Sequence, residues 1–221
     1  MFHIKICGVR LKADIDAVSQ AGGDAVGLNF FPPSVRYLDP ACSTTSELSA
    51  YAGRCGLYRV GVFVNKPADQ IRRVIDTVGL DAIQLHGDEL VTDIAGWVDL
   101  GLPLIRAVKI PGHKLTAREI EDRVRPWTDA GCHVLLDADA GSAHGGMGRS
   151  LDWDSLRGWS EQFATVRWVL AGGLQPENVA EAIRVSGARS VDVASGVESP
   201  RGQKSASRIT QFCERARNAW G

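Results

Sequence analysis

The chain has 221 residues, of which 44% are hydrophobic and 23% are charged, and its formal net charge is −1. This composition is typical of a soluble globular protein and excludes a disordered chain. The even charge balance gives no overall attraction to nucleic acid or to an anionic membrane, so we expect neither as a partner. We expect one domain over residues 1–221 and, since no apolar stretch approaches about 18 residues, no membrane span.

The cysteines and histidines favour a reducing compartment and a site without metal. The five cysteines contain no CxxC pair, which argues against a disulfide framework or a zinc ribbon. The N-terminus MFHIKICGVR has no basic segment followed by an apolar one, so we expect no signal peptide and a cytoplasmic location. The five histidines show neither HxH nor HExxH spacing, so we expect no metal.

Eight short β-rich runs recur along the chain. Several of them, such as LYRVGVFV, are apolar at nearly every position. Such runs are typical of strands buried on both faces of a parallel sheet. We expect strands at 2–7, 25–30, 57–64, 82–85, 104–108, 133–136, 167–171 and 190–193.

Helical patterns separate these runs. Thr116 and Glu119 form a T-x-x-E capping box, Pro176 suits the first turn of a helix, and Gly187 suits its end. Apolar residues share one helical face at Ile71, Val74, Ile75 and Val78, and again at Ile209, Phe212, Cys213 and Ala216. The evidence for helices after the second and sixth strands is weaker.

The alternation of eight strands with about eight helices predicts parallel strands joined by right-handed crossovers. Eight such units, at about 28 residues each (221/8), favour closure into a (β/α)8 TIM barrel of the α/β class. An open doubly wound sheet is the alternative. That fold would require GxGxxG after the first strand, where the sequence reads CGVR.

Polar residues and glycines cluster where the predicted strands end. In such barrels the chemistry lies at the C-terminal ends of the strands. The candidate site residues are Cys7, Arg36, His86, Asp137, Gly172, Gly173, Asp192, Ser195 and Gly196. Gly172-Gly173 and Ser195-Gly196 follow the last two strands, where backbone N–H groups can bind a phosphate. Either pair alone could equally be a tight turn, but together they favour phosphate.

Cys7 and Asp137 are the candidates for a base and an acid. A free cysteine is usually a buried apolar residue. Cys7, however, lies at a strand end, and Lys5 on the same face could lower the pKa of its thiol. Asp137 ends the apolar run VLLD. It could form a salt bridge or a cap, or it could act as a general acid at the barrel mouth.

Three further residues are assigned to substrate binding. Arg36 could be a solvated surface arginine, but a guanidinium in the proline-containing loop FFPPSVR could also hold a carboxylate bidentately. His86 could instead be a structural hydrogen-bonding histidine. Asp192 could be a buried, paired carboxylate.

Eight stretches, taken together, resemble the phosphoribosylanthranilate isomerase family. Any one of them is a weak signal, but their joint occurrence over nearly the whole chain is specific. They are KICG at 5–8, GDAVGLNF at 23–30, VGVFVN at 60–65, IQLHGDE at 83–89, LLDA at 135–138, GGMG at 145–148, LAGGLQPENV at 170–179 and VDVASGVES at 191–199.

The resemblance implies an enzyme of tryptophan biosynthesis that needs no cofactor. It would catalyse the Amadori rearrangement of N-(5-phosphoribosyl)anthranilate to 1-(2-carboxyphenylamino)-1-deoxyribulose 5-phosphate. The resemblance makes Cys7 the general base and Asp137 the general acid. It places Arg36 on the anthranilate carboxylate and Asp192 by the substrate amine. It assigns the phosphate to Gly172, Gly173, Ser195 and Gly196.

Two positions depart from the family pattern. Val35 replaces the proline of SPR, which loosens the loop that aims Arg36. Met147 replaces a hydroxyl residue in the glycine-rich segment 140–148, a loop that we expect to close over the site.

Other readings of the same residues stay open. A related barrel isomerase of histidine biosynthesis, or one barrel serving both substrates, would run the same rearrangement, although that family uses aspartate where Cys7 stands. A Schiff-base aldolase could use Lys5 or Lys109. A non-catalytic phosphate-binding barrel is the third alternative. For the isomerase we expect a monomer that binds a small phosphorylated molecule.

Overall fold

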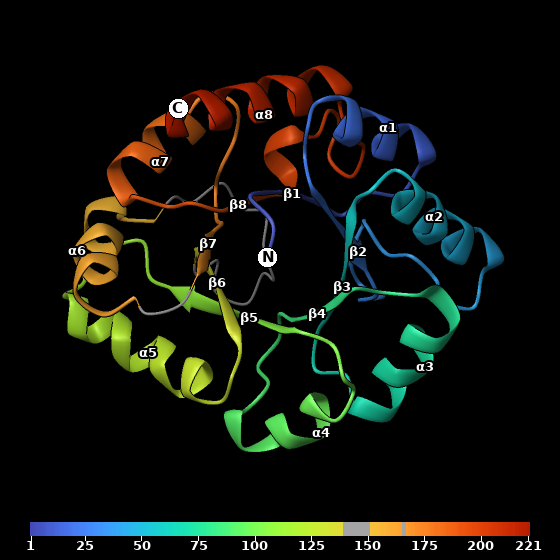
Figure 1. The fold of residues 1–221 in the computed structure, drawn as a ribbon, viewed down its shortest axis with the longest axis horizontal. Helices are drawn as coiled ribbons and strands as arrows, with labels where there is room; N and C mark the ends of the chain where they lie inside the picture. Colours follow the sequence, from blue (N-terminus) through green and yellow to red (C-terminus); the bar gives the residue numbers. More distant parts are fainter. Residues whose placement is uncertain (139–150, 165–166) are drawn as a thin grey trace.

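The computed structural model describes residues 1–138, 151–164 and 167–221 and shows eight parallel strands closed into a barrel. Each strand pairs with the next along the chain, and the last pairs with the first (Figure 1). The strands are β1 (Ile4–Cys7), β2 (Ala25–Asn29), β3 (Tyr58–Phe63), β4 (Ala82–Leu85), β5 (Leu104–Ile110), β6 (His133–Ala138), β7 (Trp168–Leu170) and β8 (Val191–Val193).

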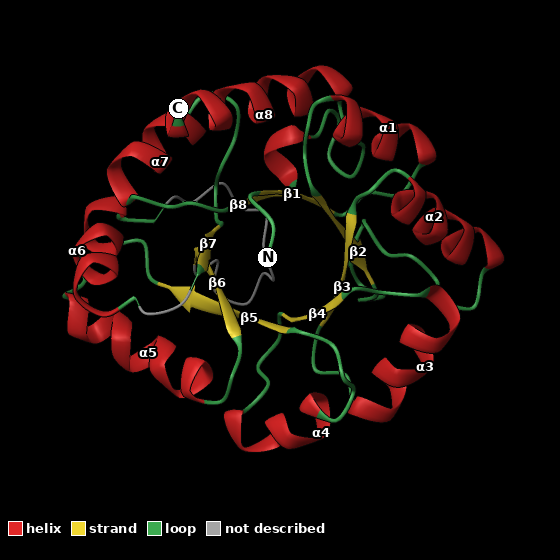
Figure 2. Cartoon of the chain, in the orientation of Figure 1, coloured by secondary structure: helices red, strands yellow, loops and turns green. Residues whose placement is uncertain are grey.

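The helices form a ring outside the strands (Figure 2), as the predicted (β/α)8 barrel requires. They are α1 (Lys12–Gln20), α2 (Ser43–Arg54), α3 (Ala68–Val78), α4 (Ile94–Val98), α5 (Ala117–Asp129), α6 (Trp153–Phe163), α7 (Val179–Ser186) and α8 (Ala206–Trp220). Short 3-10 segments, η1 (Val91–Asp93) and η2 (Ser195–Val197), precede α4 and α8. Within the described ranges, no helix is long and apolar enough to cross a membrane.

All eight predicted strands are confirmed, with small differences at their ends. One of them matters for function, because β6 continues to Ala138 and so contains Asp137 as a strand residue. The capping box is confirmed, since the Thr116 hydroxyl accepts from the backbone N–H of Glu119. Gly187 ends α7 in the left-handed region, with φ of 74°. Pro176 lies in the turn before α7 and not within it, because the helix begins at Val179.

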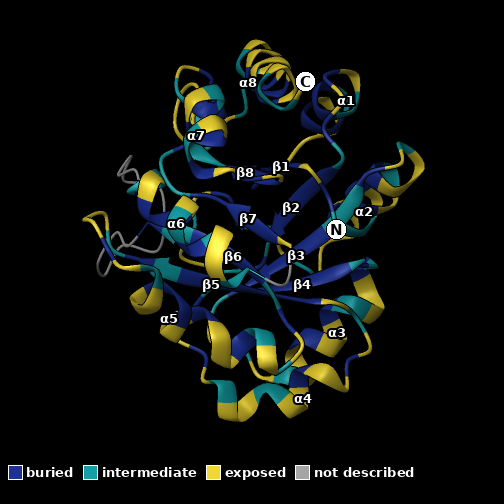
Figure 3. Ribbon diagram, turned by 60° about the vertical axis from the view of Figure 1, so that its left-hand side comes forward, coloured by how far each residue is buried: buried dark blue, intermediate teal, exposed yellow. Residues whose placement is uncertain are grey.

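Two apolar layers cover the two faces of the barrel wall. Figure 3 shows the strands almost wholly buried and the helices exposed on their outer sides. Between strands and helices, the layer includes Ile6, Leu28, Phe63, Ile83, Trp159 and Phe212. Inside the barrel, alternate strand residues form a smaller cluster of Phe2, Ala25, Val60, Ala82, Ile105, Ala107, Leu135, Val169 and Ala171. Every second strand residue therefore faces the axis, as the pleat of a strand requires.

A buried ion pair fixes the segment that follows β4. The Glu89 carboxylate accepts hydrogen bonds from the backbone N–H groups of Asn65 and Gly87, each at 2.8 Å, and pairs with Arg106. Arg106 also donates to the Gly87 carbonyl at 3.0 Å, and its guanidinium carbon lies 4.6 Å from the ring centre of Trp127. Because the carboxylate bonds to segments after both β3 and β4, it holds their ends together at the barrel mouth.

Glu89→Ala should destabilise the fold strongly. The substitution leaves the buried Arg106 charge and the backbone donors of Asn65 and Gly87 without their acceptor, and breaking a buried ion pair typically costs about 3–5 kcal/mol. Urea unfolding of the two proteins measures the change. The matched control is Glu47→Ala on an exposed face of α2, which should change stability by less than about 0.5 kcal/mol. Equal losses in the two variants would contradict the role given to Glu89.

Candidate active site

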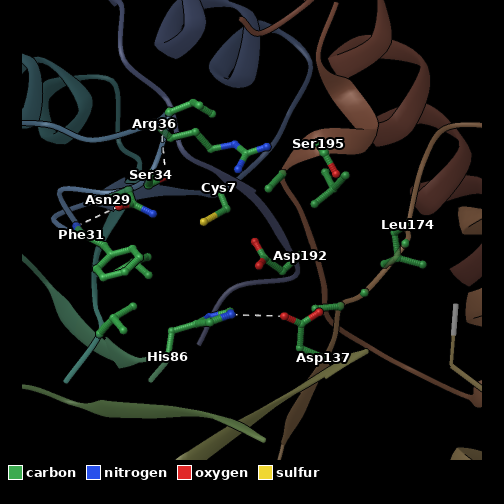
Figure 4. Close-up of a pocket in the computed structure, with 18 of the residues that line it drawn as sticks. Cys7, Asn29, Phe31, Ser34, Arg36, His86, Asp137, Leu174, Asp192 and Ser195 are labelled. Atoms are coloured by element: carbon green, nitrogen blue, oxygen red, sulfur yellow. Dashed lines mark hydrogen bonds and ion pairs between the residues drawn. The ribbon is translucent and has the colours of Figure 1, made fainter. Parts of the chain in front are cut away.

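A cavity of about 380 Å³ opens at the C-terminal ends of the strands (Figure 4). It is where the barrel architecture predicts chemistry. Of the residues proposed from the sequence, the cavity is lined by Cys7, Arg36, His86, Asp137, Gly172, Gly173, Asp192 and Ser195. Gly196 is the exception. A Cβ atom at Gly196 would lie 1.9 Å from the Leu174 carbonyl oxygen, so its α-carbon packs against that backbone and not into the cavity.

Cys7 is the last residue of β1 and faces the cavity with only 8% of its surface exposed. Burial raises the pKa of the Cys7 thiol, and Asp192 raises it further. The positive charges of Lys5, Lys204 and Arg36 act in the opposite direction but do not outweigh burial. Lys5 thus lowers the pKa of the thiol, as the sequence suggested it could, but the desolvation of the buried thiol has the larger effect.

An ion pair between a fully buried lysine and an aspartate at the cavity lies beneath the thiol. Lys5 on β1 and Asp192 on β8 are opposite each other in the strand register, and Lys5 Nζ lies 2.8 Å from Asp192 Oδ1. Burial alone would lower the pKa of Lys5, but the charges of Asp192 and Cys7 and their hydrogen bonds raise it. Lys5 is therefore held as an ammonium ion. A Schiff-base nucleophile requires the neutral amine, so this arrangement disfavours an aldolase that uses Lys5.

Asp137 faces the cavity from β6 and is paired with His86. Its Oδ2 atom lies 3.2 Å from His86 Nε2, and the other ring nitrogen of His86, Nδ1, lies 2.8 Å from Gln84 Nε2. Both Asp137 and His86 keep part of their side chains exposed, at 15% and 20%. Figure 4 shows the His86 ring and the Asp137 carboxyl on one side of the cavity and Cys7 on the other.

Arg36 reaches the cavity from the loop after β2 and is oriented by Glu198. Its Nε and Nη2 atoms donate to the two carboxylate oxygens of Glu198 at 2.6 and 2.8 Å. A guanidinium carries five N–H donors, so three remain for a ligand. Gly8 allows this placement, because its φ is 78° and a Cβ atom there would lie 2.3 Å from Arg36 Cδ.

Glu198 is the centre of a charge cluster that the sequence reasoning missed. Its Oε1 atom also accepts from Lys204 Nζ at 2.8 Å, and its Oε2 atom accepts from the backbone N–H of Gly202 at 2.9 Å. Burial alone would raise the pKa of Glu198, but the Arg36 hydrogen bond and the Lys204 charge and hydrogen bond lower it to about 2. Glu198 falls within the matched stretch VDVASGVES, which could have singled it out. No comparable signal marks Lys204.

The predicted phosphate turns lie next to each other at the mouth. Gly172, Gly173 and Ser195 line the cavity, and Asn178 braces the first turn by donating from Nδ2 to the Gly173 carbonyl at 3.0 Å. Ser195 begins η2, directly after β8. The backbone at both turns is therefore within reach of one bound group.

Of the two residues that depart from the family pattern, Val35 is described by the structure and Met147 is not. Val35 lies at the cavity with half of its surface exposed, and its carbonyl accepts from Arg10 Nη1 at 2.9 Å. A side-chain contact thus holds the loop that lacks the proline. The segment 140–148 and Met147 lie outside the described residues.

The arrangement can carry out acid–base chemistry on a molecule with an anionic group at each end. A thiol and a carboxyl group face one cavity from different strands. Glycine turns lie on one side of the cavity, and a guanidinium with free donors lies on another. Among the residues that the structure describes, no group of three or more histidine, cysteine or acidic side chains could hold a metal ion.

Comparison with curated proteins shows close relatives over the full chain. The chain is 41% identical over 220 residues to the N-(5'-phosphoribosyl)anthranilate isomerase of Rhodospirillum rubrum, covering 97% of each protein. It is 40% identical over 224 residues to the protein of the same name from Myxococcus xanthus, covering 99% of this chain and 98% of the relative.

Solved structures of proteins with the same name have the same fold as this chain. The phosphoribosyl anthranilate isomerase of Thermotoga maritima is 33% identical, with a TM-score of 0.83 over 99% of this chain and 100% of that one. A structure of such an isomerase in complex with reduced 1-(o-carboxyphenylamino)-1-deoxyribulose 5-phosphate is 32% identical, with a TM-score of 0.78 and the same coverage. The family model for N-(5'phosphoribosyl)anthranilate isomerase matches residues 4–215. The chain therefore belongs to the N-(5'-phosphoribosyl)anthranilate isomerase family.

Proposed function

We propose that this chain isomerises N-(5-phosphoribosyl)anthranilate to 1-(2-carboxyphenylamino)-1-deoxyribulose 5-phosphate in tryptophan biosynthesis. The observation that carries the proposal is that Cys7 and Asp137 face one cavity in a member of this isomerase family. The test is turnover by the purified chain, followed as the loss of the fluorescence of the anthranilate substrate. No turnover of this substrate would overturn the proposal.

Asp137 serves as the general acid in the first step. Its carboxyl group gives a proton to the ribose ring oxygen as the bond from that oxygen to C1 breaks. The nitrogen lone pair forms the C1=N bond, which leaves a protonated imine. This acid is available because Asp137 faces the cavity and keeps part of its surface exposed.

Cys7 serves as the general base in the second step. Its thiolate removes the proton from C2, and the electron pair moves toward the positive imine and forms an enol-amine. Protonation at C1 and loss of the O2 proton then give the ketone, so the reaction consumes no net proton or electron. Asp192, beside Cys7 and paired with Lys5, places a negative charge near the positive nitrogen. Positioned acids and bases each contribute roughly 10²- to 10⁴-fold.

The two ends of the substrate hold the sugar between these groups. The phosphate binds at the turns containing Gly172, Gly173, Ser195 and Gly196, and Arg36 binds the anthranilate carboxylate through the donors that Glu198 leaves free. Anchoring both ends converts the proton transfers into reactions of a positioned molecule. His86 contacts the sugar beside Asp137.

The remaining expectations about partners are part of the same proposal. We propose that the chain acts in the cytoplasm as a monomer on a small phosphorylated molecule, without nucleic acid or membrane partners. A relative from Thermotoga maritima is described as dimeric, so sedimentation of the purified chain is the direct test of its oligomeric state. Assay with the histidine-pathway aminoaldose separates a single-substrate enzyme from one that serves both pathways.

Cys7→Ala and Asp137→Asn should each lower kcat by roughly 10²-fold or more, because each removes a proton-transfer group. Binding of inorganic phosphate and the thermal unfolding temperature should stay close to those of the unmodified chain. The matched controls are Cys42→Ala and Asp76→Asn, which change exposed residues of the same types. Near-normal turnover by Cys7→Ala would remove the thiol from the mechanism.

The pH profile should reflect a pair that holds one proton. The active form has Cys7 as thiolate and Asp137 as acid, which is the same total protonation as thiol plus carboxylate. The pair holds one proton over a range of pH, so kcat/KM should form a plateau that falls on the acid side when a second proton is gained and on the alkaline side when the last proton leaves. Burial raises the pKa of Cys7, so the alkaline fall should lie above about pH 9. A fall centred below pH 8 would contradict this assignment.

Arg36→Ala should raise the KM for the substrate at least about tenfold while changing the Kd of inorganic phosphate by less than about twofold. A hydrogen bond to a charged group contributes roughly 1.5–3 kcal/mol, and each 1.4 kcal/mol is tenfold in affinity. Arg36→Lys keeps the positive charge but cannot donate two parallel hydrogen bonds to a carboxylate. Its KM for the substrate should lie between those of the unmodified chain and Arg36→Ala. Arg54→Ala, at an exposed position, is the control. Equal losses of substrate and phosphate affinity would exclude Arg36 as the carboxylate ligand.

A further inference from the structure

Gln84 is a fully buried polar residue in the apolar interior of the barrel. It lies on β4, two positions before His86, so both side chains are directed to the barrel axis. Its neighbours in the register are Val62 on β3 and Ile105 on β5. A buried amide in such surroundings is costly unless it is hydrogen-bonded. The hydrogen bond of its Nε2 atom is to His86 Nδ1, at 2.8 Å.

The orientation of the Gln84 amide bears on which ring nitrogen of His86 carries the proton, since its Nε2 atom faces Nδ1 while its Oε1 atom is buried with no hydrogen-bond partner among the described residues. The amide nitrogen of glutamine is a donor and never an acceptor. Nδ1 of His86 must therefore accept, which requires that it carry no proton. In a neutral imidazole the proton is then on Nε2.

The same reasoning extends to Asp137. His86 Nε2 lies 3.2 Å from Asp137 Oδ2, which is an ion-pair distance. A proton on Nε2 is presented toward Oδ2, which disfavours a second proton on that oxygen and leaves Oδ1 to carry the proton of the carboxylic acid. The other tautomer would present a lone pair to Oδ2, and the acid's proton would be drawn to His86 and away from the sugar.

We propose that Gln84 is a positioning residue that holds His86 as the Nε2–H tautomer and thereby keeps the proton of Asp137 on the oxygen that faces the substrate. The proposal rests on the proposed function of Asp137 for its catalytic consequence, but not for the tautomer. Gln84 acts only through His86, because it has no exposed surface and does not line the cavity.

The test is ¹⁵N–¹H correlation spectroscopy of the histidine-labelled chain at pH 8, where an imidazole is ordinarily neutral. A His86→Asn sample assigns the His86 signals. The unmodified chain should show a protonated Nε2 and an unprotonated Nδ1. A protonated Nδ1 with an unprotonated Nε2 would overturn the proposal, because the Gln84 amide would then be presenting its oxygen.

Two substitutions test the cause. Gln84→Met keeps the approximate volume but has no donor, so His86 should become a mixture of tautomers. Gln84→Glu presents acceptors, so Nδ1 should become protonated. Gln211→Glu, on an exposed position of α8, is the matched control and should leave the His86 signals unchanged. If Gln84→Met folds and retains a pure Nε2–H tautomer, Gln84 does not determine it.

The effects of Gln84→Met on kcat and on KM distinguish a positioning role for Gln84 from a purely structural one. Gln84→Met should lower kcat by about tenfold or more, a part of what a general acid contributes. The KM should change by less than about twofold, because Gln84 does not touch the cavity. If the tautomer shifts as expected but kcat does not fall, the link from Gln84 to the proton of Asp137 is wrong. If the unmodified chain has no activity, the proposed function fails while the spectra still decide the tautomer.

Discussion

The alternation of side chains along parallel strands is the constraint on which the site depends. In a closed barrel, every second residue faces the axis, and all strands end at the same mouth. This alternation places Cys7 two residues above Lys5 on β1, and His86 two residues above Gln84 on β4. The residues at the ends of the strands line the cavity where we propose that the substrate binds, and those below them form a buried polar layer to which we assign control of charge and tautomer.

That buried layer contributes to the ionisation of the residues at the mouth. The Lys5–Asp192 pair keeps a cation inside the barrel against an anion at the floor of the cavity, and burial of either charge without the other would be costly. The Lys5 cation opposes the effect of burial on Cys7 without cancelling it. Glu198 has a comparable role at the rim, because it pairs with both Arg36 and Lys204 and leaves the outer donors of Arg36 for a ligand.

The sequence predicted the fold well because the eight apolar runs and the helix signals are local. It also placed most candidate residues correctly, since strand ends in this fold converge wherever the intervening loops lead. Gln84 escaped notice although its partner His86 is two residues away, because the sequence alone does not show that both side chains are in contact inside the barrel. Lys204 escaped because its contact with Glu198 depends on the path of a loop. The raised pKa of Cys7 could not be predicted from its neighbours, because it depends on burial in three dimensions.

The central claim is geometric: the sugar lies between the Cys7 thiol and the Asp137 carboxyl, held by its phosphate and its carboxylate. A crystal structure of this chain with the reduced product analogue would test it most directly. The account predicts the phosphate at Gly172, Gly173 and Ser195, the anthranilate carboxylate on Arg36, and C2 within about 4 Å of the Cys7 sulfur. An analogue bound in the reverse direction, or with C2 out of reach of that sulfur, would contradict it.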